Sequence, residues 1–165
     1  MPKINVFAWV VAALVCAAVI LGAGVLVKSC GDQAAADRAA VAEFRRVYLM
    51  QTQAIDTALV VVGDLDNERA TNPNVRLDKG WLGNAKDAGR LIALSVGNLR
   101  GVRLPAGRED TQTRIDEMLS YYADGARLLA AIAENHDPAL LGDAIAKFDL
   151  AGAYRDGIAG DLTGR

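Results

Sequence analysis

Hydrophobic and polar residues are distributed in two different ways along this chain. Between Ile4 and Val27 no side chain is charged, whereas after residue 31 apolar residues recur every three or four positions among charged ones. A helix over Ile4 to Val27 would be about 36 Å long at about 1.5 Å per residue, enough to cross a hydrocarbon core about 30 Å thick. We therefore predict a transmembrane anchor in residues 1–30 and a separate helical domain in residues 31–165.

The anchor prediction has two competitors, a cleaved signal peptide and a lipoprotein signal. Only Lys3 precedes the apolar run, which is longer than the about 7–15 apolar residues of an ordinary signal peptide. Val27-Lys28-Ser29-Cys30 resembles the bacterial lipobox, with an aliphatic residue three positions before the cysteine and a small residue directly before it. Lys28 departs from the small or apolar residue usual at its position. Under this alternative Cys30 would carry the lipid.

The residues that flank the apolar run bear on its orientation. Trp9 suits an aromatic belt at the membrane surface, and Lys28 lies where a basic side chain meets lipid headgroups. Counting basic residues after the run places the domain in the cytoplasm, because they outnumber Lys3. An early apolar segment with a short basic head usually leads the following domain across the membrane. We expect a single-pass protein of the cell membrane with most of the chain extracytoplasmic.

Beyond the apolar run, the spacing of apolar residues predicts four amphipathic helices. We place them at Asp32–Leu65, Gly80–Leu99, from about Asp110 to residue 135, and from Asp137 and Pro138 onward, where an N-cap is followed by proline. Short links between such helices predict an all-α fold, an up-down antiparallel four-helix bundle with coiled-coil-like packing. The core stripes comprise Val41, Phe44, Tyr48, Gln51, Ile55, Ala58, Val62 and Leu65; Trp81, Ala85, Ala88, Ile92, Ser95 and Leu99; Ile115, Met118, Tyr122, Leu129 and Ile132; and Leu141, Ile145, Phe148, Ala151, Tyr154 and Ile158.

Charge and composition narrow the classes of partner. Two of the 18 basic residues and none of the 20 acidic residues lie in the first 30 positions, which leaves residues 31–165 with a formal charge of −4. A mildly acidic domain argues against nucleic acid as a partner, because neutralising phosphates requires a basic face. The preference for Arg over Lys is typical of GC-rich coding and suggests a bacterial origin.

Residues that carry chemistry are sparse. His136 is the only histidine, and the two cysteines both precede residue 31, so the domain offers neither a histidine-based metal site nor an internal disulfide. The alternating carboxylates of Asp64, Asp66 and Glu68 lack the EF-hand ligand pattern. We expect no enzyme activity, no cofactor and no metal.

Two polar segments are candidate contact surfaces. The stretch from Asn67 to Lys79 interrupts the helical pattern and predicts a long polar loop, whose candidate partner-binding residues are Arg69, Asn72, Asn74 and Arg76. Tyr121, on the third helix, is a further interface candidate. A loop predicted to face the bilayer carries Arg100, Arg103 and Arg108, which are candidates for contact with anionic lipid headgroups.

These features predict a membrane-anchored, non-enzymatic interaction or structural module of the bacterial cell envelope. Its partner would be another protein or a second copy of the chain. The alternative is a ligand-sensing bundle, because the predicted fold broadly resembles the four-helix sensor domains of bacterial receptors. A sensing pocket would then be lined by Tyr48, Trp81 and Tyr122.

Overall fold

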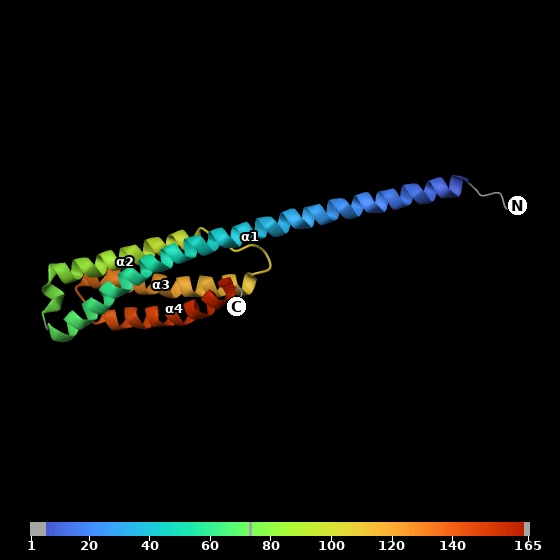
Figure 1. The fold of residues 1–165 in the computed structure, drawn as a ribbon. Coiled ribbons are helices and arrows are strands. Elements are labelled where there is room, and N and C mark those ends of the chain that lie inside the picture. Colours follow the sequence, from blue (N-terminus) through green and yellow to red (C-terminus); the bar gives the residue numbers. More distant parts are fainter. Residues whose placement is uncertain (1–5, 73, 164–165) are drawn as a thin grey trace. The chain divides into compact units, whose positions relative to one another are not determined.

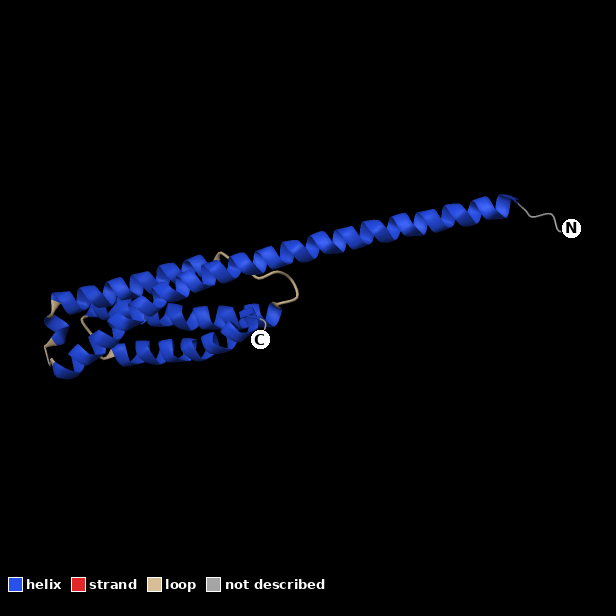
Figure 2. Cartoon of the chain, in the orientation of Figure 1, coloured by secondary structure: helices blue, strands red, loops and turns tan. Residues whose placement is uncertain are grey.

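The structure is a computed structural model that describes the backbone of residues 6–72 and 74–163 and the side chains of residues 33–72 and 74–162. Within these residues the fold is all-α, with helices α1 (Val6–Thr71), α2 (Lys79–Arg100), α3 (Glu109–Asn135) and α4 (Leu140–Thr163) and a short 3-10 helix, η1 (Val75–Leu77) (Figures 1 and 2). The chain divides into two units, Met1–Ala40 and Val41–Arg165.

The unit Val41–Arg165 is a bundle-like arrangement of the second part of α1 with α2, α3 and α4 (Figure 1). Helix α3 packs against both α2 and α4. The α1–α2 connector and the α3–α4 turn lie at the same end, since His136 Nδ1 is 3.2 Å from the carbonyl oxygen of Arg76. The α2–α3 connector lies at the opposite end (Figure 1).

The predicted core stripes are confirmed almost residue for residue. Every stripe residue of α2 and α3 is buried, and so are those of α1 apart from Val41. On α4, Ile145 and Tyr154 are only half-buried. The apolar spacing therefore identified the inward face of each helix.

Two large aromatic side chains tie α1 to the rest of the bundle. The buried indole of Trp81 donates from Nε1 to the Leu65 carbonyl oxygen at 3.0 Å, just before α1 ends. The Tyr48 hydroxyl lies 3.8 Å from the sulfur of Met118 on α3. Both polar groups thus have a partner inside the core, which avoids the cost of an unsatisfied buried donor.

Glycine sets how closely α3 approaches its neighbours. A Cβ at Gly125 would lie 2.8 Å from Phe148 Cδ1 on α4 and closer still to the edge of that ring. A Cβ at Gly89 on α2 would lie 2.9 Å from the Ala126 carbonyl oxygen. Gly125 leaves α3 unbroken, because the space that its missing side chain vacates is filled by Phe148.

The first helix extends beyond the predicted bounds at both ends, and its continuity with the apolar run is the alternative that the sequence left open, since only Ser29 to Gly31 interrupts the pattern. Asp32 is not its N-cap, because the helical backbone of α1 runs through that position. At the other end α1 continues to Thr71, whose hydroxyl donates to the carbonyl oxygens of Asn67 and Glu68. The segment predicted as a long loop from Asn67 to Lys79 is therefore a short connector, residues 72–78, that contains η1.

Aspartate side chains bond near the starts of α2 and α4, whereas α3 begins after Arg108 without a side-chain cap. Asp78 Oδ1 accepts from the backbone N–H groups of Gly80 at 2.8 Å and Trp81 at 3.1 Å at the start of α2. Asp137 Oδ1 accepts from Ala139 N–H at 3.0 Å directly before α4. The Asp78 side chain satisfies backbone donors that a helix leaves free at its N-terminus. Asp137 was predicted as the N-cap of the fourth helix, and its side chain bonds within the turn that precedes Leu140, the first residue of α4.

The predicted anchor in residues 1–30 falls where side chains are not described. Helix α1 supplies helical backbone from Val6 onward, but the side chains of Trp9, Lys28 and Cys30 lie outside the described residues. A search of the described residues finds no helix that has both the length and the apolar character needed to cross a membrane.

Candidate binding groove between α1 and α4

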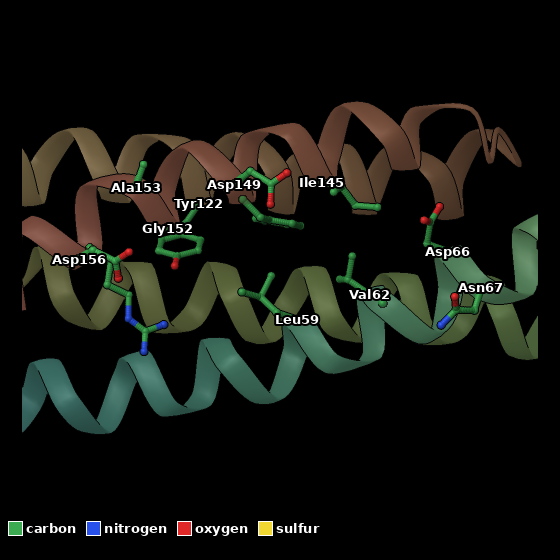
Figure 3. Close-up of a pocket in the computed structure, with 13 residues that line it drawn as sticks. Leu59, Val62, Asp66, Asn67, Tyr122, Ile145, Asp149, Gly152, Ala153 and Asp156 are labelled. Atoms are coloured by element: carbon green, nitrogen blue, oxygen red, sulfur yellow. The ribbon is translucent and has the colours of Figure 1, made fainter.

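An open groove with a volume of about 800 Å³ runs between α1 and α4 in the unit Val41–Arg165 (Figure 3). Most of its lining residues come from α1 and α4, and Tyr122 is contributed by α3. The residues that line it are Leu59, Val62, Gly63, Asp66, Asn67, Tyr122, Ile145, Phe148, Asp149, Gly152, Ala153, Arg155 and Asp156.

The floor of the groove is apolar. Leu59 and Val62 of α1 face Ile145 of α4 across it (Figure 3). Deeper in, the ring of Phe148 packs against Tyr122 with centroids 6.2 Å apart, in a tilted arrangement. Both rings that support this floor are buried.

Carboxylates follow one another along the groove. Asp149 and Asp156 lie on α4, and Asp66 lies on α1 toward the end that also carries Asn67 (Figure 3). Asp149 and Asp156 are exposed and form no hydrogen bond or ion pair with any described residue. Asp66 accepts from Arg69 Nη2 at 2.7 Å. Two carboxylates of the groove are thus available to a ligand.

The one basic residue among those that line the groove is already paired. Arg155 donates from Nη2 to Asp56 Oδ2 at 2.8 Å and from Nη1 to Asp56 Oδ1, so the pair bridges α4 and α1. The hydrogen bond to Asp56 raises the pKa of Arg155 above its ordinary value, partly offset by burial. A guanidinium committed in this way adds little positive potential to the groove.

Burial also shapes the two tyrosines beside this ion pair. Burial raises the pKa of Tyr122 above its ordinary value, while a hydrogen bond from Arg155 opposes the shift. Burial raises the pKa of Tyr48 to about 12, with Arg155 again acting in the opposite direction. Both hydroxyls therefore stay protonated and neutral near pH 7, so neither is a base in this region.

The predicted partner-binding residues of the connector do come together at one end of the bundle. Arg69 extends from the last turns of α1 and is paired with Asp66. Asn72 Oδ1 accepts from Asn74 N–H at 2.9 Å, and the Arg76 carbonyl oxygen lies beside the His136 ring. Asn72, Asn74 and Arg76 are exposed, so they form a fixed polar surface.

Tyr121 does not belong to that surface. It lies on α3 facing α4, with its ring centroid 5.7 Å from that of Tyr154 and 5.6 Å from Lys147 Nζ. The half-buried ring packs on the side of the α3–α4 pair. Tyr121 is thus separate from the other residues with which it was grouped from the sequence.

The predicted lipid-contact arginines lie in or beside the α2–α3 connector. Arg100 is the last residue of α2, and Arg108 directly precedes α3. Arg103 is paired with Asp116 of α3, with Nη1 2.7 Å from Oδ2. All three side chains are exposed, and the salt bridge leaves Arg100 and Arg108 as the more available cations of this end.

Of the three residues named for a sensing pocket, one lines the groove. Tyr48 and Trp81 are 3% and 1% exposed and face the core, and only Tyr122 lines the groove. The groove itself was not predicted from the sequence. Two signals were available there, namely the glycines at positions 63 and 152 on helix faces and the seven-residue spacing of Asp149 and Asp156.

Among the residues that the structure describes, no group of three His, Cys, Asp or Glu side chains is placed so that it could hold a metal ion. The chain was also compared with known proteins, and no family model, curated protein or solved structure matches it.

Proposed function

We propose that this protein is a membrane-anchored, non-enzymatic binding module of the bacterial cell envelope. An up-down antiparallel four-helix bundle in residues 31–165 binds a ligand, and a single transmembrane helix in residues 1–30 holds the bundle at the outer side of the membrane. The observation that carries the binding function is the α1–α4 groove, which has an apolar floor and unpaired carboxylates. Grooves of this size between the helices of a bundle are typical small-molecule sites.

The anchor is supported by the uncharged run from Ile4 to Val27. Alkaline carbonate extraction of membranes from expressing cells tests it, because a spanning helix resists extraction whereas a peripheral protein is released. Replacing Leu14 and Val19 with Lys should release the protein, because a central charge opposes insertion. Mass analysis of the mature protein then separates a retained helix from cleavage or from acylation at Cys30, and protease treatment of spheroplasts tests the side on which the bundle lies.

A thermal-shift screen of the full-length chain against a metabolite library tests the binding function. The Gly152→Leu variant fills the groove, because a Cβ at Gly152 meets no atom within 4 Å and the longer side chain has open space. Gly152→Ala is the matched control that leaves the groove open. Ligands of the groove should stabilise the parent and Gly152→Ala but not Gly152→Leu, whereas equal stabilisation of all three would place binding elsewhere.

A second candidate function, contact with another protein or with a second copy of this chain, is supported by the polar end formed by Asn72, Asn74 and Arg76. The hydrogen bond between Asn72 and Asn74 and the contact of Arg76 with His136 fix this surface before any partner arrives. Such preorganisation lowers the entropic cost of association. Cells that express Asn74→Arg/Arg76→Glu should lose crosslinked partners, and an unchanged crosslinking pattern would refute this candidate.

A further inference from the structure

We infer that the α1–α4 groove binds a linear polyamine, an extended chain in which ammonium groups are separated by methylene segments. This inference depends on the binding function proposed above for the groove, but not on the membrane anchor. Four properties of the groove support it, namely its charge, its floor, its length and its size.

The charge of the groove selects a cation. Asp149 and Asp156 have no partner among the described residues, whereas the one basic lining residue, Arg155, is held by Asp56. An anionic ligand would meet these carboxylates without a free cation to bind it. A ligand that carries ammonium groups would instead form charge-assisted hydrogen bonds with them, which are among the stronger hydrogen bonds in proteins.

The floor of the groove selects a ligand with apolar segments between its charges. Leu59, Val62 and Ile145 lie between the acidic positions and face the open volume (Figure 3). A hydrated metal ion or a small amine would leave this apolar surface in water. Methylene segments would cover it and remove its apolar atoms from water, which favours binding.

The spacing of the carboxylates selects an extended ligand. Asp149 and Asp156 are seven residues apart on α4, close to two helical turns, so they lie on one side of the helix about 10.5 Å apart along its axis. Asp66 and Asn67 continue the series of oxygen acceptors toward the opposite end of the groove (Figure 3). A single ammonium group cannot reach both aspartates, whereas a linear polyamine can.

The size of the groove favours a small molecule over a protein helix. Its volume of about 800 Å³ falls within the range of small-molecule pockets. The glycines at positions 63 and 152 keep the groove open, since a Cβ at either meets no atom within 4 Å. The groove extends along two helices, a shape that suits an unbranched chain.

Isothermal titration of the full-length chain with spermidine at low ionic strength tests the inference. Asp149→Asn/Asp156→Asn should weaken binding about tenfold, because two ammonium contacts at partly exposed carboxylates are lost. The matched control, Asp87→Asn/Asp143→Asn, removes the same charge at exposed positions outside the groove and should bind like the parent. In the parent, 1,8-diaminooctane should bind more tightly than 1,4-diaminobutane, because only the longer diamine reaches both aspartates.

Three results would overturn the inference. They are no binding of spermidine, equal weakening in both double variants, and equal affinity for the short and the long diamine. The second result would assign the binding to the overall negative charge of the domain. A different compound that stabilises the parent but not Gly152→Leu would retain the proposed binding function while excluding polyamines as its ligand. If no compound stabilises the parent more than Gly152→Leu, both the proposed binding function and the polyamine inference are refuted.

Discussion

Two glycines of the bundle have opposite surroundings, although one packs against α4 and the other belongs to it. Gly125 lies where α3 meets α4, and a side chain there would overlap the Phe148 ring. Gly152 lies on α4 where it faces α1, and a side chain there would meet open space. The first glycine permits close helix contact, whereas the second leaves a groove.

The close contact at Gly125 stabilises the fold, whereas the open space at Gly152 does not. Glycine in a helix is disfavoured by roughly 0.5–1 kcal/mol relative to alanine. At Gly125 the close packing of α3 on α4 offsets this cost. At Gly152 no packing does so, which is consistent with a position where the open space serves binding.

The largest effect is expected from adding a branched side chain to each glycine. Gly125→Val should lower the free energy of unfolding by roughly 2–3 kcal/mol, because overpacking displaces the Phe148 ring. The same change at position 152 should leave it unchanged or slightly higher. Urea denaturation of the full-length chain followed by circular dichroism measures both, and equal losses would mean that the two seams are packed alike.

The pH dependence of the unfolding free energy tests how closely α1 packs against α3 at Tyr48, a residue of α1 that does not line the groove. The folded pKa of Tyr48 is about 12, above its ordinary value of 10.0, because burial favours the neutral hydroxyl. Its contribution to stability is complete below pH 10 and is lost as the pH rises through 12, by about 2 kcal/mol. The unfolding free energy is measured at pH 9 and pH 12. The decrease between these two values should be about 2 kcal/mol smaller in Tyr48→Phe than in the parent.

Since other groups titrate in the same range, only the difference between the parent and Tyr48→Phe is informative. Near pH 7 the substitution should be nearly neutral, because the hydroxyl makes only a weak contact with Met118. A parallel pH dependence in both proteins would show that the hydroxyl of Tyr48 is not held in a desolvated site.

A smaller effect is expected at the ion pair between Arg155, which lines the groove, and Asp56. The side chains of Arg155 and Asp56 are 30% and 49% exposed, so solvent screens their attraction. A double-mutant cycle with Arg155→Met and Asp56→Asn should give a coupling energy of about 0.5–1 kcal/mol that decreases at high salt. A coupling energy near zero would mean that the pair does not hold α4 to α1.

The smallest effect is expected from alanine at the two glycines. Gly152→Ala should raise the free energy of unfolding by about 0.5–1 kcal/mol, because it removes backbone freedom from the unfolded chain and meets no neighbour. Gly125→Ala should lower it, since even one methyl group overlaps Phe148. If both variants were stabilised, the close contact at Gly125 would be refuted.

Several features followed from the sequence because they depend on local pattern. Apolar spacing located the four inward faces, including the buried positions of Ile92, Leu129 and Ile158. Asp137 was identified as a cap because an aspartate before proline satisfies the free donors of a helix start. The run from Ile4 to Val27 likewise predicts an anchor on composition alone, a prediction that stays open.

Other features depended on which helices approach each other, and periodicity carries no such information. The pattern correctly placed Tyr48 and Trp81 in the core, but it did not indicate that only Tyr122 of the three aromatic residues named for a pocket would line the groove. It did not indicate that Gly125 would meet the Phe148 ring where α3 packs on α4. It ended the first helix too early, because the exposed last turns of α1 have no apolar stripe to mark them.

The sequence by itself thus determined the helical class and the inward face of each helix. Only the tertiary structure decided that α1 and α4 stay apart along part of their length and leave a groove beside Tyr122. The physical reason is that burial of a helix face follows from its own residues, whereas a groove is set by the distance between two helices. That distance depends on side chains from every helix of the bundle.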